Sequence, residues 1–153
     1  MSEPSVPLSR VFTEDHRELD DRFEVFRSTP AGEGSLRAER FGAFASGLRR
    51  HIAIEEEQLF PAFERESPGQ RWLTERLRDE HRRILDVLER TERQLLGSPP
   101  STVELEEELV NVLWSHNSRE EEAVYPWFDL HLAAGLAMQA ERALRRPSPS
   151  AGE

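Results

Sequence analysis

The sequence predicts an all-α protein of one domain, with four long amphipathic helices followed by a short C-terminal helix. Apolar residues recur at three- and four-residue steps along most of the chain, which is typical of amphipathic helices. Clusters rich in glycine and proline separate these periodic stretches. No stretch shows the alternation of a strand, and 153 residues fit one compact unit.

The first half of the chain contains two of the predicted helices. Helical periodicity extends over about 8–27 and again over about 35–60, and the breaker segment 29–34 lies between them. Pro61 follows the second helix. We expect it to end or kink this helix, because proline lacks an N–H and its ring clashes with the preceding turn.

The second half has the same organisation. Its helices are predicted over about 68–96 and 101–125, and Pro126 follows the fourth helix as Pro61 follows the second. Each helix is preceded by a serine with Gln or Glu three residues later, the pattern of a capping box. These pairs are Ser67 with Gln70 and Ser101 with Glu104.

The remaining segments are short. Weak periodicity predicts a C-terminal helix over about 127–145, so the helical domain spans 8–145. Residues 1–7 and 146–153 are polar and rich in proline and serine, and we expect them to be disordered.

The composition excludes several classes of function. A net charge of −10 does not fit a nucleic-acid or anionic-membrane surface, which needs clustered positive charge. The absence of cysteine excludes disulfides, thiolate metal sites and iron–sulfur clusters. No window approaches the length of a membrane span, so a cytoplasmic location is expected, and no protein partner is indicated.

A duplication with an offset of 65 residues carries the candidate site. His16 and His51 correspond to His81 and His116. The same offset relates the other landmarks, which are Glu55 with Glu120, Glu56 with Glu121, Phe60 with Tyr125, Pro61 with Pro126 and Phe63 with Phe128. The chain is therefore predicted to consist of two similar helical hairpins.

The spacing within each copy is typical of a half-site for a metal. His51 with Glu55, and His116 with Glu120, are four residues apart, so each pair presents an imidazole and a carboxylate on one helix face. His16 and His81 lie on the apolar stripes of the other two helices. A core histidine taken alone is usually structural, but four histidines and two glutamates directed inward need a bound cation to offset their burial.

The donor set indicates which metals are suitable. Imidazole and carboxylate ligands without sulfur suit iron, manganese or zinc, and six such ligands are too many for one tetrahedral zinc ion. Two metals fit better. If Glu55 and Glu120 both bridge, each metal receives two histidine nitrogens and two bridging oxygens, and positions remain for an oxo or hydroxo bridge and an exogenous ligand.

These residues resemble the hemerythrin-like family, also described as HHE cation-binding domains. The pattern His…HxxxE…His…HxxxE is matched by His16, His51 to Glu55, His81 and His116 to Glu120, within about 9–130. A ferritin-like site would need ExxH pairs, and none exists here. The resemblance implies an up-down-up-down four-helix bundle around a non-haem di-iron centre with bridging glutamates, and makes manganese or zinc less suitable than iron.

The resemblance leaves the activity open. Oxygen-carrying members have a fifth histidine one turn from the third-helix ligand, whereas His81 has Leu77 and Leu85 as turn neighbours. We therefore expect a protein that binds or reacts with dioxygen, hydrogen peroxide or nitric oxide, with peroxide or nitric-oxide chemistry preferred. As an enzyme it would be a di-iron peroxidase or catalase, or a nitric-oxide-reactive oxidoreductase. The alternative is a non-enzymatic protein that binds or senses oxygen or iron.

Five further side chains require separate interpretation. Asp20, four residues after His16, is the best candidate for an extra ligand, although a solvated aspartate fits equally well. Glu56 and Glu121 are weaker candidates and are more typical of surface charges. Tyr125 would face away from the site in a regular helix. His131 lies outside the duplication and is expected near the surface.

Overall fold

The computed structural model describes residues 6–146, and every regular element in that range is helical. Residues 1–5 and 147–153, which make up most of the two segments predicted to be disordered, lie outside the described residues. None of the helices between residues 6 and 146 combines the length and apolar character that a membrane crossing needs.

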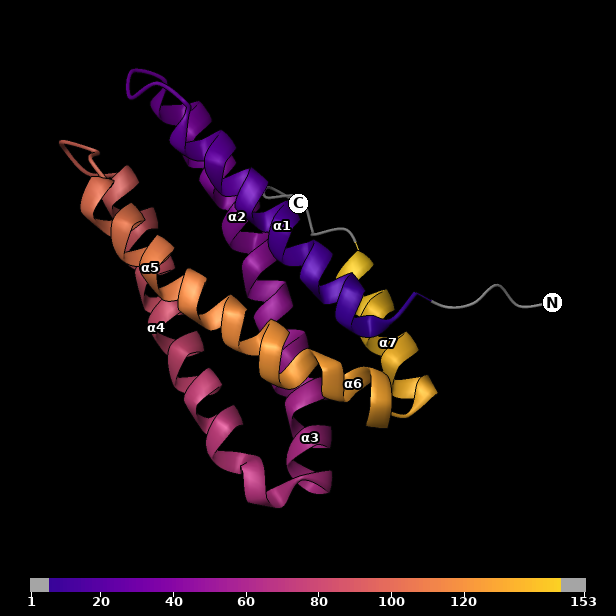
Figure 1. The fold of residues 1–153 in the computed structure, drawn as a ribbon. Helices are drawn as coiled ribbons and strands as arrows, with labels where there is room; N and C mark the ends of the chain where they lie inside the picture. Colours follow the sequence, from indigo (N-terminus) through magenta and orange to yellow (C-terminus); the bar gives the residue numbers. More distant parts are fainter. Residues whose placement is uncertain (1–5, 147–153) are drawn as a thin grey trace.

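Two helical hairpins form the main body (Figure 1). The first hairpin pairs α1 (Leu8–Arg27) with α2 (Gly34–Ile54), and the second pairs α4 (Arg71–Leu95) with α5 (Val103–Arg119). The hairpins contact each other through α2 and α4. The observed bounds of α1 coincide with the predicted 8–27, because its apolar stripe is uninterrupted and the turn after Arg27 breaks it.

Pro61 and Pro126 do not end the second and fourth helices. After α2 the chain forms one π-helical turn, η1 (Glu55–Leu59), and continues as α3 (Phe60–Glu66). After α5 it forms the equivalent turn η3 (Glu120–Val124) and continues as α6 (Tyr125–His131). Each proline lies in the first turn of the helix that follows, where a missing N–H is tolerated.

The predicted helix starts need correction in the second half. Residues Pro68–Gln70 form a 3₁₀ turn, η2, and neither Ser67 nor Thr102, the residue before α5, makes a side-chain capping bond to the backbone. The predicted capping boxes are therefore wrong. The Thr102 hydroxyl instead donates to Glu106 Oε2 over 2.8 Å, so it is already used.

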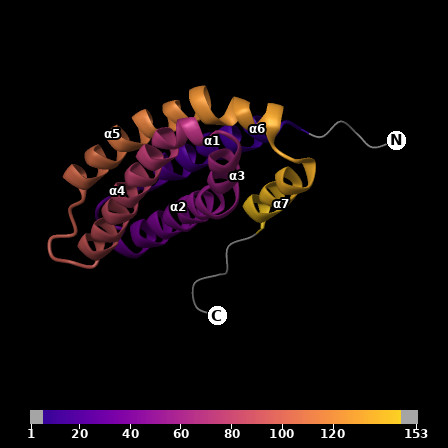
Figure 2. The same cartoon turned by 90° about the horizontal axis from the view of Figure 1, so that it is seen from below.

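The C-terminal helix is shorter than predicted. Residues 127–131 belong to α6, and α7 (Ala134–Arg145) begins only after an extended residue, Leu132. α7 packs against α2 and α1 near the end of the first hairpin (Figure 2).

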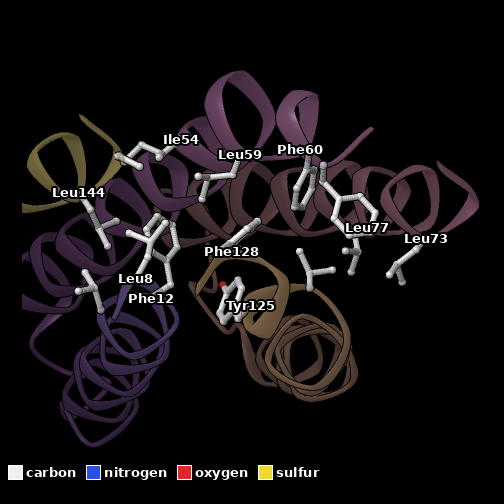
Figure 3. Close-up of a cluster of buried hydrophobic side chains, with 14 residues drawn as sticks. Leu8, Phe12, Ile54, Leu59, Phe60, Leu73, Leu77, Tyr125, Phe128 and Leu144 are labelled. Carbon is white, nitrogen blue, oxygen red and sulfur yellow. The ribbon is translucent and has the colours of Figure 1, made fainter. Parts of the chain in front are cut away.

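The core consists of two apolar clusters with a polar layer between them. The first apolar cluster, drawn in Figure 3, lies around α3, α6 and α7 and includes Phe12, Phe60, Leu77, Tyr125 and Phe128. The second apolar cluster lies between the two hairpins and includes Leu19, Leu48, Ile84, Leu88 and Leu113. Phe12 and Leu19, three to four residues either side of His16, belong to different clusters. The candidate site therefore occupies the layer between the clusters.

Candidate metal centre

The six residues predicted as ligands lie together in this polar layer. They come from α1, α2, η1, α4, α5 and η3, and each is at most 4% exposed. The residues are His16, His51, Glu55, His81, His116 and Glu120. Six ionisable side chains buried at one place would destabilise the fold unless they were paired or bound a cation.

The histidines form two pairs, one from each hairpin. The ring centroids of His16 and His51, the first histidine pair, are 4.7 Å apart. Those of His81 and His116, the second histidine pair, are 4.6 Å apart. Both pairs direct Nε2 toward the two buried glutamates, so the nitrogen that faces the centre is the same in all four rings.

The glutamate side chains lie between the two histidine pairs. Glu55 Oε2 is 3.4 Å from His51 Nε2, while its other oxygen, Oε1, is 3.3 Å from His81 Nε2. Glu120 Oε1 is 3.3 Å from His16 Nε2 and 3.1 Å from His116 Nε2. Each glutamate thus contacts histidines from both hairpins, an arrangement suited to a carboxylate bridge.

Four further carboxylates contact the outer nitrogens of the same rings, and we call them the outer carboxylates. Each accepts a hydrogen bond from one histidine Nδ1, over 2.7 to 3.1 Å. The pairs are His16 with Glu121, His51 with Asp15, His81 with Glu56 and His116 with Glu80. Such contacts fix the orientation and tautomer of a metal-binding imidazole.

The outer carboxylates also follow the duplication, because Asp15 corresponds to Glu80 and Glu56 to Glu121. Asp15 and Glu80 immediately precede the lone histidine of each copy, a signal that was present in the sequence. Glu56 and Glu121, predicted to be surface charges or weak ligand candidates, are half-buried and orient histidines of the opposite hairpin.

The carboxylates raise the pKa values of the buried histidines in the metal-free chain. Burial lowers the pKa of His51, but Glu55 and Asp15 outweigh it and raise the pKa to about 10. Burial likewise opposes the carboxylates around His81 and His116, whose pKa values are raised to about 11 and about 9. The pKa of Glu120 is lowered, because the surrounding histidines outweigh the effect of its burial.

Tyr125 points into the site, so the prediction from a regular helix is wrong. In η3 the Tyr125 N–H donates to the Glu120 carbonyl, five residues back instead of four. This wider turn absorbs one residue, and Tyr125 falls where the residue four after Glu120 would lie in an α-helix. Its hydroxyl donates to Glu55 Oε2 over 2.7 Å, and burial raises the pKa of the phenol well above its ordinary value.

The Hemerythrin HHE cation binding domain matches residues 8–128, which is most of the chain. The chain belongs to this family. The resemblance inferred from the histidine and glutamate spacing is thereby confirmed. No curated protein and no solved structure gives a significant match.

Two groups of donor atoms in this HHE domain lie close enough to hold a cation. One consists of Glu55, His81, His116 and Glu120, and the other of His16, His51 and Glu120. Within each group the donor atoms lie within 4.8 Å of one another. Glu120 belongs to both groups, which is what a shared ligand between two ions would require.

Asp20 and His131 belong to neither donor group. Asp20 is exposed and lines a groove between α1 and α5, beside His16. Burial on one side raises the pKa of its carboxyl, against the opposing effect of His16. His131 is exposed at the end of α6 and packs on Trp127, with ring centroids 5.5 Å apart.

Proposed function

We propose that the chain is a non-haem di-iron protein, built as an up-down-up-down four-helix bundle, that binds or reacts with a small redox ligand. The preferred ligands are hydrogen peroxide and nitric oxide, with dioxygen as the third. The six inward donors His16, His51, Glu55, His81, His116 and Glu120 would hold the metals, and Asp20 would not.

One observation carries the proposal. Glu55 Oε1, His81 Nε2 and Glu120 Oε2 are buried and make no hydrogen bond within the described residues, although they face one another. His81 Nε2 lies 3.3 Å from the first oxygen and 3.7 Å from the second. Unpaired buried polar atoms are rare because they cost about 1–3 kcal/mol each, and a shared cation would satisfy all three.

The chemistry of the donors favours iron. Four imidazoles and two carboxylates, with no thiolate, form a set of intermediate hardness that suits iron in either oxidation state. Bound iron would supply Lewis-acid and one-electron redox chemistry. The chain itself would bind and orient the metals, exclude bulk water through the two apolar clusters, and fix the histidine tautomers through the outer carboxylates.

Access for a small ligand is available from one side. A groove of about 440 Å³ between α1 and α5 is lined by His16, Asp20, Trp114, Asn117 and Glu121, among others. It therefore extends from the surface to a histidine of the first pair.

Because the two pairs supply equal numbers of imidazoles, the centre lacks the imidazole-rich metal expected of an oxygen carrier, which supports peroxide or nitric-oxide chemistry.

Elemental analysis tests the metal content. The purified chain, loaded with iron(II) and freed of excess metal, is expected to retain about two iron atoms, the number that suits six donors with shared carboxylates. His131→Ala is the control, because this exposed histidine should not change the iron content. One zinc or no metal per chain would contradict the proposal.

Absorption spectroscopy tests the ligand. We expect spectral changes when the iron-loaded chain meets peroxide or nitric oxide, and loss of added peroxide that disappears in His51→Ala but persists in His131→Ala. Reversible oxygenation without peroxide turnover would instead support the non-enzymatic alternative of oxygen binding or sensing.

A further inference from the structure

The hydroxyl of Tyr125 occupies the centre of the first half of the site. It lies 3.1 Å from Nε2 of both His16 and His51. It is also 2.7 Å from Glu55 Oε2 and 3.2 Å from Glu120 Oε1. Four groups that would bind a metal thus surround one phenol oxygen.

The phenol is held at this place by its surroundings. Tyr125 is fully buried, and its ring packs against Phe12 and Phe128, with centroids 5.8 and 5.6 Å away. Figure 3 shows the ring inside the first apolar cluster, in which it provides the one side-chain oxygen. Its backbone is fixed by the bond to Glu120 in η3. The side chain is therefore held in place by ring packing and by the hydrogen bonds of its hydroxyl.

The second half of the site has no such oxygen. The residue that corresponds to Tyr125 is Phe60, whose ring is stacked on His81 at 5.6 Å with the planes nearly parallel. The three buried site atoms without hydrogen bonds, Glu55 Oε1, His81 Nε2 and Glu120 Oε2, belong to this half. At this position the two halves therefore differ by one atom, the phenol oxygen.

A metal held by the first histidine pair would have to bind this oxygen or displace it. Bonds from such an ion to imidazole nitrogen are roughly 2.0–2.1 Å long, so the ion would lie close to the present position of Oη. Because the packed ring cannot leave, a small withdrawal of Tyr125 along its own axis would place Oη in the coordination sphere.

We propose that Tyr125 is a metal ligand, through Oη, for the ion held by His16 and His51. The inference rests on the proposed function, since it requires a metal there. On coordination the phenol O–H bond is replaced by a metal–oxygen bond, and the proton is released to solvent. One metal would then carry an additional anionic oxygen donor, which favours iron(III), while its neighbour beside Phe60 would not.

Tyr125→Phe in the full chain tests the proposal. The native chain and the variant are loaded with iron(II), exposed to air and analysed for iron, visible absorption and resonance Raman scattering. The native chain is expected to show a phenolate-to-iron(III) charge-transfer band with enhanced tyrosinate modes. Tyr125 is the chain's only tyrosine, so these modes have one source. The variant should lose both the charge-transfer band and the tyrosinate modes. It should also bind iron between His16 and His51 at least about tenfold more weakly.

Phe128→Leu is the matched control, because it removes an aromatic ring of the same cluster without removing an oxygen. It should keep the tyrosinate modes. Zinc has no visible bands, so a titration with zinc can be followed in the ultraviolet. The native chain should give a tyrosinate difference spectrum, and Tyr125→Phe should give none.

The outcomes separate the two proposals. A native chain that holds two irons without tyrosinate modes would overturn the ligand assignment and leave the di-iron proposal intact. A band unchanged in Tyr125→Phe would have the same meaning. A native chain that holds no iron would overturn both.

Discussion

Each histidine of the site uses its two ring nitrogens for different contacts. Nδ1 donates to an outer carboxylate, and Nε2 faces Glu55 and Glu120. The outer bond fixes the ring and increases the electron density that Nε2 offers to a metal. The orientation of the four rings is therefore built into the fold before any metal arrives.

Glu120 is the residue on which both proposed metal positions would depend. It contacts histidines of both pairs and belongs to both donor groups. We expect Glu120→Gln to weaken iron retention at both positions by at least about tenfold. Asp20→Asn, which changes an exposed side chain on the neighbouring face, should leave iron retention unchanged. Iron content after dialysis against a weak chelator measures both. Equal losses would make Asp20 a ligand.

At the scale of single residues, the sequence predicts which side chains face the centre where spacing determines direction. The i,i+4 pairs and the offset of 65 residues suffice for His51, Glu55, His116 and Glu120. The outer carboxylates could not be assigned, because an acid on a helix surface looks solvated until the neighbouring helix is known. Asp15 and Glu80 become recognisable only when the histidine of the other helix is placed beside them.

The π-helical turns decide how the second and fourth helices pass the site. η1 and η3 occupy equivalent positions, each beginning at the inward glutamate and ending before Phe60 or Tyr125. A turn with one extra residue lets both the glutamate and the aromatic side chain point inward. The same turn places the following proline at the start of a new helix, so the chain continues without a break.

Deletion of exposed Ala123, inside η3, should be tolerated better than deletion of exposed Ser115, inside α5. Removing Ala123 converts the π turn to an α turn and leaves the following side chains facing inward, at a cost of about 3 kcal/mol or more from Pro126. Removing Ser115 rotates His116 and Glu120 by about 100° relative to the preceding helix. Circular dichroism melting and iron content measure the difference. Equal damage would show that the turn does not absorb a residue.

For whole elements, the sequence predicts the helices accurately where apolar periodicity is the only pattern. It is inaccurate where a proline follows the periodic stretch. The bounds of α1 follow from its apolar stripe alone. Pro61 predicted an end or kink, but nothing local to Glu55–Leu59 indicates a π turn. Phe60 and Phe63, which follow this turn, pack in the first apolar cluster, and such contacts between distant segments cannot be read from the local sequence. The same reason explains why the inward direction of Tyr125 was missed.

In the whole molecule, the polar layer lies between two apolar clusters, and this burial links the stability of the metal-free chain to pH. The pKa values of His51, His81 and His116 are raised from 6.5 to about 10, 11 and 9. Protonation therefore favours the folded state. This contribution is complete below pH 6.5 and is lost as the pH rises through the folded values.

The chelator-treated chain should accordingly have a lower melting temperature at a pH of about 10 than at about 6.5, because its histidines lose protons that the folded state holds more tightly. Iron should show the opposite trend, and stabilise the chain more at the higher pH, because it competes with those protons. Thermal melting with and without iron measures both. His131→Gln is the control and should behave like the native chain. If the melting temperature of the metal-free native chain does not fall at the higher pH, the raised pKa values of the buried histidines are contradicted.

The duplication has a consequence for how unequal the two proposed metal positions can be. Each half contains a lone histidine, an HxxxE pair and two outer carboxylates, so two separate copies of one hairpin would pair about a twofold axis with the same set of contacts. Such a homodimer would carry the same aromatic residue at both metals by necessity. Joining the halves in one chain removes that constraint, and tyrosine at 125 opposite phenylalanine at 60 is the difference that covalent linkage permits.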